Sequence, residues 1–328
     1  MDPKKFFVNE MPKKHPFAKL IKNDPFFKYD DAPGYSKDGY YFDTYVNLTV
    51  YSSKDSKYLD ECLKMCERYD ALFSPTIEGS DVYNINHAAG ESVKVDPETY
   101  YLLQRAIEFC EETDGAVDIT IAPLMDTWGL SHESGILSEA GITEKKSKPT
   151  DSKIQDALKN VDYRNVIIED DYTVRLKNPE TRIDLGFIAK GYIADKLKEY
   201  LVSKDVKSAI ISLGGNVVVI GTKPDGSDYN IGIKDPDNSG EIIESLKANN
   251  SSVVTSGTYE RYVEYDGIKY HHILDTSTGY PVDNGIKSVT ILSDSSLEGD
   301  ALSTVCLILG EEGSKDILTK YNAEAVFH

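Results

Sequence analysis

The sequence lacks several short motifs that would assign a chemistry directly. Its few cysteines form no C-x2-C pair and no H-E-x-x-H occurs, which argues against a zinc site or a dithiol redox centre. No G-x-G-x-x-G occurs either, so the usual dinucleotide fingerprint is missing. The cysteines lie in apolar or amphipathic segments, and we predict buried thiols even for the two that are one helical turn apart. They are Cys62, Cys66, Cys110 and Cys306.

Long apolar runs and positive charge are also scarce. No stretch of 18 or more apolar residues occurs, and the first residues contain no apolar signal region, so the chain as written carries no anchor or secretion signal unless one has been removed. With 36 Lys and Arg against 55 Asp and Glu, the formal charge is −19. Nucleic acid and anionic membranes are therefore disfavoured as main partners. A small anion would need a local cation.

What the chain does have is enough apolar sequence for a large core, at 40% of 328 residues. Residues 1–38 are rich in Lys, Pro, Asp and Phe without a regular period, and we interpret them as an extended leader or linker. Residues 39–328 read as one continuous domain, of a size that is common for catalytic domains. Strands and helices are mixed there without strict alternation, so the predicted fold class is α+β.

The expected elements follow from periodicity and capping residues. Alternation predicts a strand over 41–51, and helical spacing predicts helices over 56–72 and 97–113, the second capped by Asp96. A polar segment from about 131 to 152 reads as a surface insertion. For the second half we expect a strand at 164–176, strand-turn-helix at 181–203, a strand at 207–213, hairpin segments at 216–234, strands within 251–275 and at 286–293, and a helix at 297–309.

The first candidate site is the segment Asp184-Leu185-Gly186-Phe187-Ile188-Ala189-Lys190-Gly191. A strand that turns at a glycine into a helix presents backbone N–H groups and the positive helix end, which suits a phosphate. The spacing of the two glycines imitates a P-loop, yet Tyr192 follows where Lys-Ser/Thr is required, so a nucleoside-triphosphatase is rejected. An ordinary strand-to-helix turn would explain the same pattern.

The second candidate is a helix start with a capping box made by Ser295 and Glu298. Asp300 and Thr304 then lie one turn apart with Cβ atoms roughly 5–6 Å from each other, so both can offer oxygen to one hard cation. Magnesium fits such sparse ligation because it keeps waters and uses phosphate oxygens. A dipole-favoured Asp beside a back-bonded Thr is the alternative.

The third candidate is a histidine pair on a predicted strand. Alternation points His271 and His272 to opposite faces, so they cannot readily share a metal, but one of them can act as a general base. A structural histidine is the alternative. Two glycine-containing segments, 211–216 and 255–261, mark points of close backbone approach.

Taken together and in order, these segments resemble the ApbE family of FAD:protein FMN transferases. The matching pieces are Asp118-Ile119-Thr120-x2-Pro123-Leu124 with Trp128-Gly129, Asp184-Leu185-Gly186-x-Ile188-Ala189-Lys190-Gly191-Tyr192, Ser212-Leu213-Gly214-Gly215-Asn216, Thr255-Ser256-Gly257-x-Tyr259, His272-x-Leu274-Asp275-x2-Thr278-Gly279, and Asp300-x3-Thr304. The resemblance implies an ApbE, T-fold-like α+β domain, a magnesium ion, and transfer of FMN from FAD to a threonine hydroxyl of a partner protein with release of AMP.

The resemblance also implies roles for individual residues. Asp300, Thr304 and the backbone carbonyl of Phe187 match the family's magnesium ligands, and His272 matches the histidine thought to deprotonate the acceptor threonine. The positions that match FAD contacts are Asp184, Lys190, Asp126, Thr127, Trp128, Leu274, Phe42 and Ser80.

Three departures from the family pattern stand out: the bulk of Phe187, Thr276 where proline is common, and the end at His328 where relatives often continue. The alternatives are a magnesium-dependent FAD pyrophosphatase and a non-catalytic FAD-binding protein. The family suggests an extracytoplasmic, lipid-anchored bacterial protein, with a cytoplasmic one as the alternative. The expected partners are FAD and an acceptor flavoprotein subunit with a threonine-containing motif, but no nucleic acid.

Overall fold

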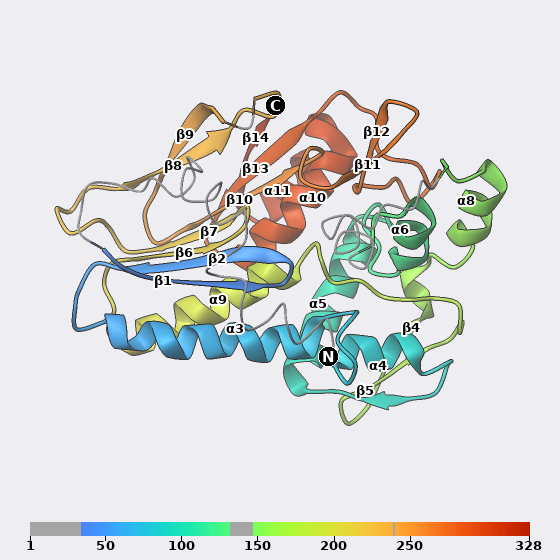
Figure 1. Ribbon diagram of the computed structural model, residues 1–328, viewed down its shortest axis with the longest axis horizontal. Coiled ribbons are helices and arrows are strands. Elements are labelled where there is room, and N and C mark those ends of the chain that lie inside the picture. The colour runs from blue at the N-terminus through green and yellow to red at the C-terminus, as the bar shows by residue number, and fades with distance from the viewer. Residues whose placement is uncertain (1–33, 132–146, 239) are drawn as a thin grey trace.

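A seven-stranded antiparallel sheet organises the computed structural model, which describes residues 34–131, 147–238 and 240–328 (Figure 1). β1 and β2 form a hairpin at one edge, and later strands extend the sheet to β14 at the other. In spatial order the strands are β1 (Tyr35–Tyr41), β2 (Thr44–Val50), β6 (Ala209–Leu213), β7 (Asn216–Ile220), β10 (Ser252–Gly257), β13 (Ser288–Ser293) and β14 (Glu324–Phe327).

Helices cover one face of this sheet and enclose the main core, while the hairpin of β8 and β9 covers the other face (Figure 1). The covering helices are α3 (Leu59–Phe73), α9 (Ala189–Ser203) and α10 (Ser296–Gly313), followed by α11 (Lys315–Lys320). β8 (Tyr229–Lys234) and β9 (Ile242–Ala248) pack Tyr229 and Ile231 against Val217 and Val253 of the sheet.

The rest of the chain forms a second region beside the sheet (Figure 1). A satellite core gathers there around the buried Trp128 and Leu274, with Tyr265 and Ile154. The elements of this region are α4 (Asp81–His87), β3 (Val93–Lys94), α5 (Pro97–Glu112), α6 (Ala122–Trp128), α8 (Asp151–Leu158), β4 (Val166–Glu169), β5 (Thr173–Leu176), β11 (Tyr262–Tyr265) and β12 (Ile268–His271), and two 3-10 turns lie at Ser56–Tyr58 and Tyr163–Asn165.

One of the places where the main core and the satellite core meet is the short stretch that follows β12. Ile273 is buried in the main core, whereas its neighbour Leu274 is buried in the satellite core. His272 directly precedes them and therefore lies where the two halves join. This position is held from both sides by packed apolar residues, which suits a side chain that must keep one orientation.

The predicted α+β class is confirmed, as are the main helices with their caps. Asp96 accepts a hydrogen bond from the Glu98 amide at 2.9 Å, and Ser295 accepts one from the Glu298 amide at 3.3 Å. The cysteines are buried and unpaired, as predicted. Among the described residues, no helix is both long and apolar enough to cross a bilayer.

Several predicted boundaries and pairings were wrong. β1 begins at Tyr35, inside the predicted leader, of which residues 1–33 lie outside the described part. The strand expected at 41–51 is the second half of a hairpin, because Phe42 and Asp43, both with φ of 55°, form its turn. The strand at 164–176 is likewise a hairpin.

The remaining corrections concern partners that are distant in sequence. The strand expected at the start of 181–203, ending at Leu185, is a loop with a single bridge between Ile121 and Arg182. The expected hairpin at 216–234 is absent because β7 joins the large sheet whereas β8 pairs with β9. Most of the predicted insertion, residues 132–146, lies outside the described residues. The insertion was expected to run to about residue 152, but α8 already begins at Asp151.

Candidate active site

His272 is held by a backbone carbonyl at the base of the β11–β12 hairpin. The Arg261 carbonyl accepts the His272 amide at 3.0 Å and lies 3.1 Å from Nδ1. Because a carbonyl can only accept, Nδ1 carries the ring proton and the lone pair is on Nε2. Burial lowers the pKa of His272 to about 3, and the positive charge of Arg261 acts in the same direction. The ring is therefore a neutral acceptor at physiological pH.

His271 is fixed differently, as strand alternation predicts. Its Nε2 donates to the Val282 carbonyl at 3.0 Å, so this nitrogen carries the proton. Its Nδ1 is buried and has no hydrogen-bond partner among the described residues. Burial lowers the pKa of His271 as well. The two neighbouring imidazoles thus contact different segments, and His271 is tied into the fold.

Lys190 and Asp300 form the charged centre of the site. The Lys190 Nζ lies 3.8 Å from the Asp300 Oδ1 and donates to the Gly186 carbonyl at 3.1 Å. The Gly191 amide donates to the Asp300 Oδ2 at 2.8 Å. Burial of this carboxylate, only 3% exposed, raises the pKa of Asp300, and Lys190 opposes that shift. One oxygen of Asp300 is thereby fixed by the backbone while the other faces the lysine.

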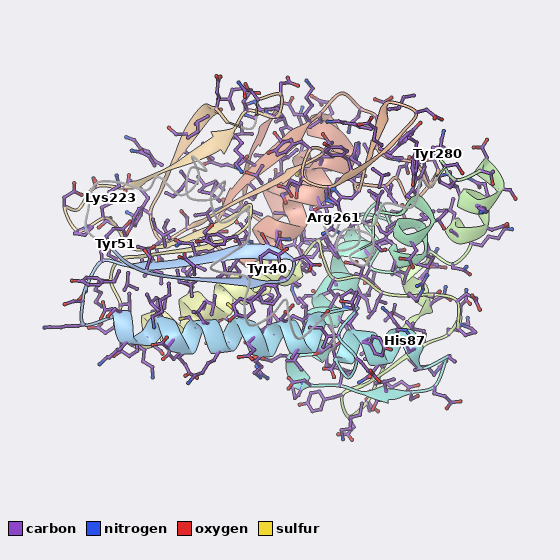
Figure 2. All side chains as sticks on the ribbon, in the orientation of Figure 1. Tyr40, Tyr51, His87, Lys223, Arg261 and Tyr280 are labelled. Carbon is purple, nitrogen blue, oxygen red and sulfur yellow. The ribbon has the colours of Figure 1, made fainter. Side chains whose placement is uncertain are left out.

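The positive charge of Lys190 reaches His272, because it contributes to the lowered pKa of the imidazole. The structure therefore brings together three of the residues singled out from sequence. They come from α9, α10 and the segment after β12, which are far apart in the chain. Figure 2 labels Arg261, whose carbonyl orients His272, near the centre of the molecule.

Thr304 follows Asp300 by one turn of α10, and its hydroxyl meets the end of β10. The Ser256 Oγ lies 3.3 Å from the Thr304 Oγ1 and 2.7 Å from the Ser303 Oγ. The Phe187 side chain packs against the main core, which accommodates the bulk noted from sequence. In the described part of the chain, no three His, Cys, Asp or Glu residues gather as a metal site. Any cation here depends on one carboxylate plus hydroxyl and carbonyl oxygens, a hard donor set that suits magnesium.

The predicted flavin contacts on α6 are built into the satellite core. Trp128 is fully buried, donates from Nε1 to the Gly279 carbonyl at 2.8 Å, and stacks on Tyr270 with ring centroids 5.1 Å apart. Asp126 pairs with Arg182 at 2.6 Å, and Thr127 donates to the carbonyl one turn back at 2.9 Å. The β11–β12 hairpin thus packs on Trp128 through Tyr265 and Tyr270, and its second strand leads into His272.

The other three residues predicted to contact FAD make hydrogen bonds that shape a loop, a helix start and a turn. Asp184 accepts the Gly186 amide at 2.6 Å and so closes the loop before α9. Ser80 caps α4 by accepting the Tyr83 amide at 3.0 Å and is 1% exposed. Phe42 occupies the β1–β2 turn, where its amide donates to an α3 carboxylate, that of Asp70, at 3.2 Å.

Comparisons with known proteins identify the family of this chain. The family model described as "ApbE family" matches residues 42–327. The chain belongs to the ApbE family. A curated relative from Klebsiella pneumoniae (strain 342), an FAD:protein FMN transferase, is 36% identical over 286 residues, which cover 86% of this chain and 85% of the relative. A relative of the same name from Treponema pallidum (strain Nichols) is 31% identical over 316 residues, covering 89% and 84%.

Solved ApbE structures share the fold as well. The ApbE protein of Thermotoga maritima superposes with a TM-score of 0.80 at 34% identity, covering 90% of this chain and 94% of that one. The flavin transferase ApbE of Vibrio cholerae superposes with a TM-score of 0.75 at 25% identity, covering 90% and 93%. The expected ApbE fold is therefore confirmed.

Within this ApbE site, sequence reasoning missed Glu260. A Cβ atom added to Gly215 would stand 3.2 Å from the Glu260 Oε1, so the two glycine-containing segments meet here. The residue keeps contact with solvent, yet crowding by protein atoms raises the pKa of Glu260 to about 7, against the charges of Lys190, Lys234 and Arg261. A single acidic residue after a strand carries no signal in sequence, because surface loops are full of them.

Proposed function

We propose that this ApbE protein transfers FMN from FAD to a threonine hydroxyl of an acceptor protein in a magnesium-dependent reaction that releases AMP. Its family and its curated relatives make it an FAD:protein FMN transferase that acts on an acceptor protein. The observation that carries the chemistry is the neutral His272, oriented by the Arg261 carbonyl and electrostatically linked to Lys190 beside Asp300.

Each residue of the site has a separate role in the proposed reaction. The acceptor hydroxyl attacks the phosphorus of the FMN half and gives its proton to the His272 Nε2, while the bond from phosphorus to the AMP oxygen breaks and AMP leaves. Lys190 neutralises charge that develops on the phosphate oxygens. Asp300, Thr304 and the Phe187 carbonyl would hold Mg²⁺, which when bound supplies further neutralisation of the pyrophosphate.

FAD itself would be recognised by the positions that match family contacts. We propose that Asp184 lies near the phosphates with Lys190, since both flank the loop that opens α9. The α6 segment with Trp128 and Leu274 would border the flavin side, where the satellite core supplies an apolar wall. Asp126, Thr127, Phe42 and Ser80 complete the proposed set.

A covalent assay separates the transferase from its alternatives. Purified protein is mixed with FAD, Mg²⁺ and an acceptor flavoprotein subunit, and the acceptor is examined for flavin fluorescence in a denaturing gel and for the mass of FMN minus water. Labelling that disappears when the acceptor threonine is replaced by alanine supports the proposal. Release of FMN and AMP without labelling identifies a pyrophosphatase instead, and unchanged FAD identifies a binding protein.

A further inference from the structure

A carboxylate from α9 caps the first turn of α10, the helix that carries Asp300 and Thr304. Asp195 accepts the Ser296 amide at 2.9 Å with Oδ1 and the Leu297 amide at 3.0 Å with Oδ2. Its Oδ2 also accepts the Ser295 hydroxyl at 3.0 Å. Amides in the first turn of a helix lack partners within it, and an anion there is favoured by the helix dipole.

The same face of α9 touches α10 a second time, one turn earlier. Gly191 precedes Asp195 by four residues, and its amide donates to Asp300. A Cβ atom at Gly191 would stand 2.2 Å from the Ser296 carbonyl oxygen and 2.7 Å from the Asp300 Cβ. The two helices are therefore in contact both at Gly191 and at Asp195. At Gly191 no side chain separates them.

Another bond anchors the start of α10, but to the sheet rather than to α9. The Ser296 Oγ donates to the Asn216 Oδ1 at 2.8 Å. This bond fixes one end of α10 on β7 but makes no contact with α9. Asp195 adds a second constraint between the two helices to the bond that joins Gly191 and Asp300, because its two oxygens bind two consecutive amides of the first turn of α10.

We propose that Asp195 is a positioning residue for the cation site. By fixing the first turn of α10 on α9, it holds Asp300 and Thr304 opposite Lys190 and the 186–188 loop. The inference rests on the proposed function, because the magnesium ion at Asp300 is itself proposed. Groups that orient metal ligands typically change metal affinity by roughly 10–100-fold when they are removed.

Metal binding, measured apart from turnover, tests the role. Mn²⁺ replaces Mg²⁺ as a paramagnetic probe, ADP supplies a pyrophosphate without flavin, and bound Mn²⁺ is counted by electron paramagnetic resonance. Asp195→Asn keeps one oxygen acceptor and Asp195→Ala keeps none. We expect Mn²⁺ affinity to fall about 10–100-fold in the alanine variant, with the asparagine variant between it and the wild type.

The matched control is the helix cap at the start of α5. Asp96 accepts the Glu98 amide at 2.9 Å but belongs to a different helix, so Asp96→Asn and Asp96→Ala should lower the melting temperature without changing Mn²⁺ affinity. Unchanged Mn²⁺ affinity in both Asp195 variants overturns the inference while the metal site stands. A wild-type protein that binds no Mn²⁺ with ADP overturns the metal site itself, and this inference with it.

Discussion

At the scale of single residues, the hydrogen-bond partner of a ring nitrogen separates two histidines that are adjacent in sequence. The Arg261 carbonyl fixes the proton of His272 on Nδ1, whereas the Val282 carbonyl fixes that of His271 on Nε2. Both rings are neutral, but they contact different segments of the chain. Strand alternation predicts the separation of the two rings, while only the structure gives the tautomer of each.

The base assignment predicts different losses for the two histidines. His272→Ala should reduce single-turnover FMN transfer by roughly 10²–10⁴-fold, because the acceptor hydroxyl loses its proton acceptor, while FAD affinity stays nearly unchanged. His271→Ala should cost stability through the lost bond to Val282 but leave far more transfer activity. Rapid-quench measurement of both variants checks this. Greater loss in His271→Ala would show that the register is misassigned, and losses below tenfold in both would place the base elsewhere.

The raised pKa of Glu260 predicts a pH-dependent contribution to stability. Its folded pKa of about 7 exceeds the ordinary value of 4.5, so between these values the folded protein holds a proton that the unfolded chain has lost. The favourable contribution is complete below about pH 4.5 and is lost as pH rises through about 7. Glu260→Gln removes this dependence, so the variant should gain stability relative to wild type between pH 5 and pH 8.

Urea denaturation of the ligand-free proteins at both pH values measures this gain. Glu264→Gln, an exposed carboxylate on nearby β11, controls for removal of one negative charge. If the free energy of unfolding of Glu260→Gln differs from that of the wild type by the same amount at pH 5 and at pH 8, then Glu260 has the same pKa in the folded and unfolded states.

At the scale of elements, the contact of α9 with α10 depends on one glycine. Gly191→Ala places a methyl group where the Ser296 carbonyl oxygen would be 2.2 Å away, so the helices must separate. We expect a loss of about 1–3 kcal/mol in the free energy of unfolding, together with weaker metal binding because Asp300 moves with α10. Urea denaturation and Mn²⁺ titration measure the two effects.

Gly240→Ala is the control, since its Cβ would meet only the Asn238 Oδ1, at 3.8 Å. Stability and metal affinity equal to wild type in Gly191→Ala would show that the helices can separate without cost. Loss of stability with full metal affinity would show that the contact supports the fold alone.

Elements were predictable from sequence where their signals are local. The capping residues Asp96 and Ser295 mark helix starts correctly, because a cap acts on amides two or three residues away. Strand partners were not predictable in the same way. Val217 lies in a continuous apolar run and Tyr229 in an alternating one, yet nothing within either run indicates that β8 pairs with β9 rather than with the large sheet. Residues 35–38, the first half of β1, fall within the predicted leader because an edge strand can be polar.

In the candidate site, too, the residues with a sequence motif were predictable, whereas contacts between distant segments were not. The ordered motifs predicted Lys190, His272 and Asp300 as neighbours in function, and in the structure Lys190 lies 3.8 Å from Asp300 while its charge also acts on His272. The Arg261 contribution is a backbone carbonyl, which no residue identity reveals. The role inferred for Asp195 depends on two helices that meet only in the folded chain.

At the scale of the whole molecule, the negative net charge of the chain disfavours binding of the negatively charged FAD. The chain carries a formal charge of −19, and FAD brings a pyrophosphate with two negative charges. Inside the site, the buried Asp300 adds a further negative charge within 3.8 Å of Lys190. Asp300 therefore offsets part of the positive charge that Lys190 offers to the phosphates. A bound divalent cation would reverse the local sign.

This balance predicts that FAD binding depends on Mg²⁺ whereas binding of an uncharged flavin does not. Chelation of Mg²⁺ should raise the Kd of FAD at least tenfold, about 1.4 kcal/mol, and the increase should be larger at low ionic strength because the repulsion is then less screened. Riboflavin lacks the phosphates and serves as the control, with a Kd that should not change. Trp128 is the single tryptophan of the chain and contacts the proposed flavin wall, so quenching of its fluorescence reports both titrations. If FAD binds equally well with and without the metal while riboflavin behaves as expected, the pyrophosphate is held by protein groups alone, and Asp300 cannot owe its place in the site to a cation.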